Sequence, residues 1–281
     1  MDNSFNTPAQ LFDANMNAGE AKSKLPLLKC IVLGIMAGAF IAFGGATSSA
    51  AIHNIANQGL AKTLAGCIFP VGLMMIVFVG GELFTGDCLM ISGVIGKRFS
   101  ALAMIKTLVV VFFSNMIGAV IVAALVYYSG LLDYTNGALG AFTIKVAYGK
   151  VNLSPVTAIC SGILCNILVC VAVLMAGAAK DIVGKVWAIF FPIWAFVVGG
   201  WEHCVANMFY IPAGIIASGN ENYVAKAEEL YGITAEQITA SLNIGGFAGN
   251  LLPVTIGNIL GGMVFVAVPL YIIHKSKIAN K

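Results

Sequence analysis

Charged side chains are scarce in this sequence: lysine, arginine, aspartate and glutamate together account for only 10% of its 281 residues. A soluble domain contains roughly 25% charged residues, so this chain has too few to cover a surface that faces water. Hydrophobic residues make up 59% of the chain. The composition therefore indicates a protein that crosses the lipid bilayer several times. The net charge of +3 is small and the lysines are scattered, which argues against a nucleic-acid-binding surface.

Targeting signals and metal-binding motifs are also missing. The first 26 residues are polar and lack the apolar core of a cleaved signal peptide. The cysteines form neither CxxC motifs nor other metal-binding spacings, and they are typical of small packing residues. We therefore expect no disulfide, no metal and no cofactor. The seven cysteines are Cys30, Cys67, Cys88, Cys160, Cys165, Cys170 and Cys204.

Long stretches without charge locate the membrane spans. A helix needs about 20 apolar residues to cross the hydrocarbon core of a bilayer. Two apolar regions are interrupted by polar residues, and each interruption begins at a glycine pair, Gly80-Gly81 or Gly199-Gly200, which predicts a broken helix. The uninterrupted spans are expected near 30–52, 107–130, 156–179 and 250–273, and the broken spans near 64–95 and 186–217.

The basic residues predict the direction of these six spans. Eleven of the 15 lysines and arginines fall in the segments on one side of the membrane, which include both termini. The positive-inside rule places that side in the cytoplasm, and we expect a multi-pass protein of the bacterial cytoplasmic membrane. We predict one transmembrane channel domain over 1–281. It comprises a cytoplasmic segment 1–26 with a short amphipathic helix near 8–23, a six-helix pore over 27–274 and a cytoplasmic tail over 275–281.

The two halves of the chain resemble each other in the order of their motifs. The broken helix is the second of three spans in each half, and three spans per half require opposite orientations in the membrane. Matching interruptions in an inverted repeat are typical of a transport site. The glycine pairs Gly34/Gly38 and Gly257/Gly261 also predict close helix contacts. The matching motifs are Gly34-x3-Gly38 with Gly162-x3-Asn166, and Asn115-x2-Gly118 with Asn258-x2-Gly261.

The polar residues at the breaks point to a small anion. A titratable side chain at membrane depth is costly and usually faces a cavity or a partner. Where a helix breaks, the second half-helix presents free N–H groups and the positive end of its dipole. Thr85 adds a hydroxyl at one break and His203 a ring N–H at the other. The alternative is that His203 is a structural residue that holds a neighbouring backbone group.

Other residues around the breaks have structural and pore-lining interpretations. Glu202 and His203 are adjacent and do not share a helix face, so they do not form an acid–base pair. We expect Glu82, Glu202 and Asn207 to stabilise the broken backbone. Bulky apolar residues near the breaks predict either ordinary helix packing or hydrophobic constrictions on both sides of a polar midpoint. These residues are Phe69, Leu73, Leu83 and Phe196.

The chain resembles the formate/nitrite transporter family over essentially its whole length, and five segments carry the resemblance. The resemblance implies an aquaporin-like six-helix protomer that assembles as a homopentamer with one pore in each protomer. The segment GGELFTGDCLM resembles the hydrosulfide-channel branch of the family. The matching segments are AGAFIAFG at 37–44, GGELFTG at 80–86, GILCNILVC at 162–170, GGWEHCVANMFYIPAG at 199–214 and LLPVTIGNILGG at 251–262.

The resemblance also implies roles for individual residues. The central pore histidine of the family falls on His203 and the threonine of the first break on Thr85. The vestibule lysines fall on Lys150 outside and Lys22 inside, although the match of Lys22 requires a one-residue gap. Trp201 replaces the phenylalanine that is common before the Glu-His pair. The constriction residues fall on Leu73, Leu83 and Phe196 with Phe69 nearby, and the pore asparagines on Asn166 and Asn258.

We therefore predict a passive, pH-sensitive pore for small monovalent anions: hydrosulfide and also formate or nitrite. Lys150 and Lys22 would concentrate anions at the two mouths. His203, with Thr85 and Asn258, would offer the anion a positive charge or a proton between the constrictions. The alternatives are a proton-coupled formate or nitrite transporter and an aquaporin-type pore for neutral solutes. The chain lacks a nucleophile motif beside His203 and Glu202, so we do not expect an enzyme.

Overall fold

The computed structural model describes residues 5–275, which form helices apart from turns, loops and one isolated β-bridge. Six segments are long and apolar enough to cross a membrane, as expected. The helices of the first half are α1 (Pro8–Ser23), α2 (Leu27–Ile52), α3 (Gln58–Ile68), α4 (Val71–Val79), α5 (Phe84–Asp87), η1 (Cys88–Met90), α6 (Ile91–Ile95) and α7 (Ala101–Tyr128). The remaining helices are η2 (Leu131–Asp133), α8 (Ala138–Val151), α9 (Pro155–Ala178), α10 (Ile182–Gly199), α11 (Cys204–Ala217), α12 (Glu221–Tyr231), α13 (Ala235–Ser241), α14 (Ile244–Gly262), η3 (Met263–Ala267) and α15 (Val268–Lys275).

Several spans begin earlier than expected from the charges. Helix α7 starts at Ala101 and includes Lys106, and the second span starts at Gln58 and includes Lys62. A lysine near the end of a span extends its long side chain toward the headgroups, so it does not end the helix. The charge-free stretches therefore identified the spans correctly but placed some of their ends too far inward.

Both expected helix breaks are present. The first break, residues 80–83, separates α4 from α5, and the second break, residues 200–203, separates α10 from α11. Gly80 has a φ of 108° and Gly200 a φ of 69°, which side chains other than glycine rarely adopt. The glycine pairs therefore let the chain leave the helix at these points, as the sequence predicted.

Glycines bring α2 against α7 and α9 against α14. A Cβ at Gly38 would lie 2.0 Å from the carbonyl oxygen of Asn115, and a Cβ at Gly257 would lie 2.3 Å from that of Ile159. Both distances are too short for any side chain, so these helix backbones touch. The predicted glycine faces are confirmed.

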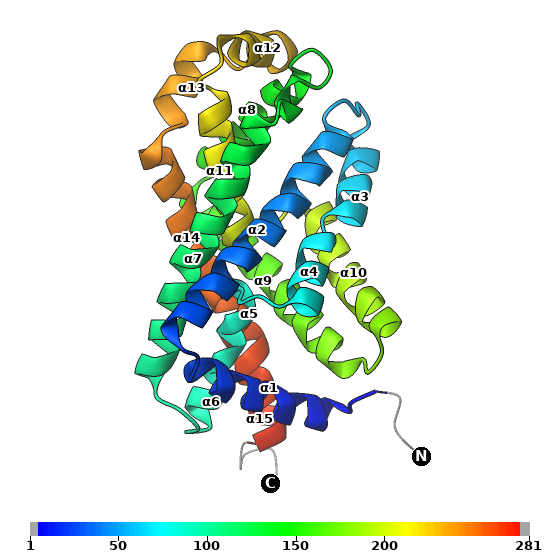
Figure 1. Cartoon of the computed structure of the whole chain (residues 1–281), viewed down its shortest axis with the longest axis vertical. Helices are drawn as coiled ribbons and strands as arrows, with labels where there is room; N and C mark the ends of the chain where they lie inside the picture. Colours follow the sequence, from blue (N-terminus) through cyan, green and yellow to red (C-terminus); the bar gives the residue numbers. More distant parts are fainter. Residues whose placement is uncertain (1–4, 276–281) are drawn as a thin grey trace.

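Short helices cover the two ends of the bundle (Figure 1). Helix α1 lies across one end, where α15 also lies, and α12 and α13 lie at the opposite end. Thr7 and Gln10 form a capping box at the start of α1, which confirms the helix expected near 8–23. Of the expected tail 275–281, residues 276–281 lie outside the described part of the chain.

Candidate functional site at the two helix breaks

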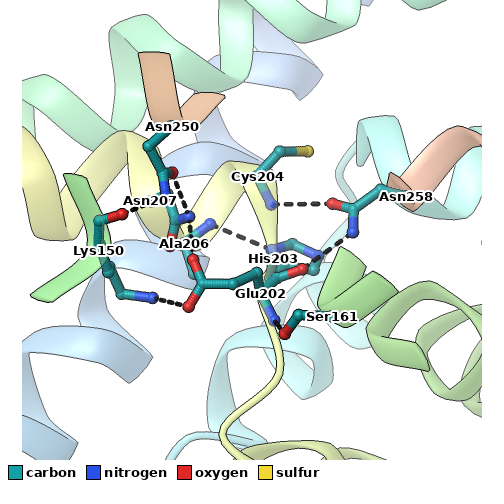
Figure 2. Close-up of polar contacts among 9 residues, drawn as sticks. All are labelled: Lys150, Ser161, Glu202, His203, Cys204, Ala206, Asn207, Asn250 and Asn258. Atoms are coloured by element: carbon teal, nitrogen blue, oxygen red, sulfur yellow. Dashed lines mark hydrogen bonds and ion pairs between the residues drawn. The ribbon is translucent and has the colours of Figure 1, made fainter. Parts of the chain in front are cut away.

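His203 connects the two breaks through its ring. It is the N-cap residue of α11, and its Nδ1 accepts a hydrogen bond from the backbone N–H of Ala206 at 3.1 Å (Figure 2). Its Nε2 lies 2.9 Å from the hydroxyl oxygen of Thr85 in α5. Both side chains are buried. The structure thus brings together the two polar residues that the sequence selected, 118 positions apart in the chain.

These partners define the protonation of the ring. Because Nδ1 accepts a backbone N–H, it carries no proton, and the neutral imidazole has its proton on Nε2. The Nε2–H therefore donates to the hydroxyl of Thr85. Protonation of His203 at Nδ1 would break its bond to Ala206 and place a cation at the positive end of α11. The local geometry thus stabilises a neutral, hydrogen-bond-donating histidine.

A small apolar chamber lies beside His203. The four bulky residues selected from the sequence all line it, as does the histidine itself. Its volume is about 10 Å³, which is enough for about one water molecule. A chamber of this size is too small to be a wide passage. Its lining residues are Ile41, Phe69, Leu73, Leu83, Val169, Ile193, Phe196 and His203.

A larger cavity, called here the vestibule, also reaches His203. It has a volume of about 290 Å³. Residues of α2, α3 and α8 line it on the side of the bundle where α12 lies. Phe69, Phe196 and His203 line both the vestibule and the chamber, so they form the boundary between the two. Lys62, Lys150, Trp201 and Tyr210 are among the other residues of the vestibule wall.

Asn258 stabilises the second break by bonding to its backbone. Its side-chain oxygen accepts from the N–H of Cys204 at 2.9 Å. Its side-chain nitrogen donates to the carbonyl oxygen of Gly162 at 2.8 Å and to that of Glu202 at 2.9 Å, the latter bond being drawn in Figure 2. The hydroxyl of Ser161 accepts from the N–H of Glu202 at 3.0 Å. These bonds satisfy backbone groups that the broken helix leaves free.

Asn115 makes the same three bonds at the first break. Its side-chain oxygen accepts from the N–H of Phe84 at 3.0 Å, and its nitrogen donates to the carbonyl oxygens of Gly34 and Glu82, both at 2.8 Å. Each partner occupies the matching position in the other half of the chain. The repeated pattern is independent evidence for the inverted repeat that the sequence motifs indicated.

The expected pore asparagines contact the backbone instead. Asn258 uses its amide on the three backbone groups described above, and Asn166 donates to the carbonyl oxygens of Asn258 at 2.6 Å and Thr85 at 3.2 Å. A side-chain amide that is fully bonded and buried has no free donor to offer a passing anion. The structure therefore differs from the expectation: it directs both amides to the breaks rather than to the passage. Sequence reasoning noted Asn115 as part of a repeat but did not select it as a site residue.

Lys150 is paired with the carboxylate of Glu202. Its Nζ lies 2.8 Å from Oε1 of Glu202, and Oε2 accepts from the amide of Asn207 at 2.6 Å. Asn250 accepts from Asn207 at 2.8 Å and donates to the carbonyl oxygen of Lys150 at 2.7 Å. Glu202 and Asn207 were expected to stabilise the broken backbone, but their side chains instead connect α8, α11 and α14. The charge of Lys150 is balanced.

Lys22 is paired with two carboxylates at the other end of the pore. Its Nζ lies 2.7 Å from Oε2 of Glu82 and 2.5 Å from Oδ1 of Asp87. Burial by itself lowers the pKa of Lys22, but the charges of Asp87 and Glu82 more than offset this, so the net pKa is raised. The ammonium group therefore stays charged and holds α1 against the first break. The expected free cation in an inner vestibule is instead part of a buried ion-pair cluster.

Within residues 5–275, no group of three or more histidine, cysteine or acidic side chains is placed to hold a metal ion. The seven cysteines are free thiols.

Comparisons with known proteins agree with this geometry. A family model described as Formate/nitrite transporter matches residues 9–272. A probable formate transporter of Methanothermobacter thermautotrophicus is 41% identical, with 95% of this chain and 96% of that protein covered. The formate channel FocA of Haemophilus influenzae is 37% identical, with 93% of this chain and 92% of that protein covered. The solved structure of a pentameric formate channel with formate bound has a TM-score of 0.77 at 31% identity, with 89% and 98% of the two chains covered. These relatives are channels or transporters by name, which confirms the expectation that the chain is not an enzyme.

Proposed function

The chain belongs to the formate/nitrite transporter family, and on that premise we propose that it is a passive pore for small monovalent anions, with formate as the first candidate. Nitrite and hydrosulfide are further candidates. Formate is placed first because the relatives are named for it, and hydrosulfide follows from the segment GGELFTGDCLM. We further propose a homopentamer in the bacterial cytoplasmic membrane, with both termini in the cytoplasm.

The position of His203 carries this proposal. It lies at the boundary between a vestibule of about 290 Å³ and a chamber of about 10 Å³ whose other lining residues are apolar. An anion that enters the vestibule meets His203 at the entrance to the constriction, and the buried hydroxyl of Thr85 lies 2.9 Å from Nε2 of His203. Two polar donors at this point favour a small anion over a metal ion or an organic cation.

We propose that His203 acts as a neutral hydrogen-bond donor to the anion. The bond from Ala206 to Nδ1 supports this role because it favours the neutral ring. The anion would replace the Thr85 oxygen as the acceptor of the Nε2–H, and the hydroxyl of Thr85 would turn to donate as well. Glu202 and Lys150 balance each other's charge and hold α11 in place.

A proton-coupled transporter is the second candidate, and the apolar chamber is the observation that favours it. A bare anion is strongly disfavoured in a space lined by leucine, isoleucine, valine and phenylalanine. The conjugate acid is neutral and crosses such a space more readily. In that mechanism, a proton crosses the membrane with every anion, whether it comes from solution or from a transiently protonated His203.

Flux measurements in proteoliposomes test both mechanisms. Stopped-flow uptake of formate, nitrite, acetate and hydrosulfide is measured across pH, with a trapped dye that reports internal pH and protein-free liposomes as the control for leakage. The passive anion pore predicts uptake without acidification, and the proton-coupled transporter predicts one proton for each anion. Uptake of none of the four above the leakage would refute both, and swelling in glycerol would then indicate a neutral-solute pore.

The His203→Asn variant separates the two roles of the histidine. Asparagine is a good N-cap residue and can accept from the N–H of Ala206, but it does not become a cation near neutral pH. If His203 donates only a hydrogen bond, His203→Asn should keep anion uptake that varies little with pH. If His203 donates its own proton, uptake by His203→Asn should fall to the leakage rate.

A further inference from the structure

One face of the second span points toward the pore from Lys62 to Leu73. The spacing of three, four and four residues places Lys62, Ala65, Phe69 and Leu73 on one side of the span that α3 and α4 form together. Lys62 and Ala65 line the vestibule, Leu73 lines the chamber, and Phe69 lines both. Lys62 therefore belongs to this pore-lining face and lies about two helical turns from Phe69, on the vestibule side.

Lys62 carries the unbalanced positive charge of the vestibule wall. The charge of Lys150, the other lysine there, is balanced by Glu202 at 2.8 Å. No carboxylate of the described part of the chain forms an ion pair with Lys62, whose side chain is exposed. Among the vestibule residues, Lys62 therefore has an ammonium group available to an incoming anion.

The second break leaves space for this ammonium group. A Cβ at Gly200 would lie 3.2 Å from Nζ of Lys62, so the missing side chain of the glycine makes room for it. Gly200 is the C-cap of α10, and the C-terminal end of a helix attracts a cation. Helices α3 and α10 lie side by side in Figure 1. Gly200 precedes His203 by three residues in the chain. The break therefore positions the charge of Lys62 at the vestibule.

Lys62 also lines a second, outer cavity of about 550 Å³. Ile52, Phe142 and Val146 are shared by this cavity and the vestibule, so the two are adjacent. Lys145 lies in the outer cavity, where its Nζ is 4.4 Å from the centre of the Tyr231 ring. An anion that moves inward meets Lys145 and then Lys62 before it reaches His203.

We infer that Lys62 is the capture residue of the external vestibule: it binds small monovalent anions and raises their concentration in front of His203. This inference rests on the proposed function and deepens it, since it transfers the attracting charge from Lys150 to Lys62. Lys62 affects the first step, entry of the anion, and leaves the constriction unchanged. Its effect is greatest at low anion concentration and low ionic strength.

The charge of Lys62 is tested by formate uptake into proteoliposomes. Lys62→Gln should raise the formate concentration for half-maximal uptake by about three- to tenfold at low salt, and Lys62→Glu should raise it further. The shift should shrink as ionic strength rises from about 0.01 M to about 1 M, because the Debye length falls from about 30 Å to about 3 Å. Lys226→Gln is the matched control, since Lys226 is paired with Glu229 and lies outside both cavities.

Chemical restoration of the charge excludes a merely structural effect. Lys62→Cys is made with Cys67 and Cys160, the two exposed cysteines, replaced by serine. Reaction with 2-aminoethyl methanethiosulfonate restores an ammonium group and should restore uptake, whereas the 2-sulfonatoethyl reagent of similar size should lower it. Equal half-maximal concentrations for wild type, Lys62→Gln and Lys62→Glu would overturn the inference, as would equal effects of the two reagents. Absence of uptake by the wild type would instead overturn the proposed function.

Discussion

Replacement of Asn258 by alanine tests how the breaks are stabilised in the membrane. The side chain is fully buried and makes three hydrogen bonds, to the N–H of Cys204 and to the carbonyl oxygens of Gly162 and Glu202. Alanine removes all three hydrogen bonds at once and leaves the three backbone groups without the side chain that bonds them. The affected backbone groups lie where the helix is broken and have no helical partner to return to.

The expected loss follows from the number of bonds. A buried polar group that loses its partner costs about 1–3 kcal/mol, and side-chain hydrogen bonds in membrane proteins average about 0.6 kcal/mol with a maximum near 1.7 kcal/mol. Three bonds therefore predict a loss of about 2–6 kcal/mol in the free energy of unfolding. Asn115→Ala should have an effect of the same size, because it loses the same three types of bond. Ser161→Ala loses one bond and should cost about 1 kcal/mol.

Equilibrium unfolding in mixed detergent micelles, followed by circular dichroism, measures these differences. Asn222→Ala provides a control, since Asn222 is exposed on α12 and its side chain bonds none of the groups at the breaks. The expected order of destabilisation is Asn258→Ala and Asn115→Ala together, then Ser161→Ala, then the control. If Asn258→Ala unfolded at the same detergent fraction as the control, the asparagine would not stabilise the break.

The remaining predictions concern the ion-pair cluster and the glycine contacts. Lys22→Met should destabilise the protein by about 3–5 kcal/mol, because Glu82 and Asp87 then remain buried without their cation. Unfolding in detergent micelles measures this loss, and a variant as stable as the wild type would contradict the prediction. Gly118→Ala should prevent the protein from folding normally, since its Cβ would lie 1.9 Å from a backbone oxygen of α2. Gly149→Ala, whose Cβ would meet nothing within 4 Å, should fold as the wild type does; size-exclusion profiles in detergent compare the two.

The spans and the breaks could be predicted from the sequence because charge and polarity are unusual in the bilayer core. Polar residues and glycine pairs are unusual in an apolar run, so Gly80 and Gly200 are visible without a structure. His203 was selected in the same way, whereas the bulky residues beside the breaks were compatible with ordinary packing and only the family resemblance implied a constriction. The structure gathers them with His203 around one small chamber.

The partners of the lysines could not be predicted in this way. Lys150 meets Glu202 across 52 positions of the chain, and Lys22 meets Asp87 across 65. Each charge alone predicts attraction of an anion, and only the tertiary structure shows that a carboxylate already balances it. The same limit applies to Asn258, whose spacing in the repeat was visible but whose partners were not.

The inverted repeat also explains where the polarity of the pore comes from. Leu83 and His203 occupy matching positions, each following a glutamate and each forming the N-cap of the second half-helix. Their backbones are nearly identical, with φ and ψ of −111° and 121° for Leu83 and −113° and 116° for His203. The symmetric backbone therefore presents an apolar side chain at one break and a hydrogen-bonding ring at the other. Because the vestibule reaches His203 while Leu83 lines the chamber, this one difference would place the polar step of the proposed pathway before the apolar one for an anion that enters from the vestibule.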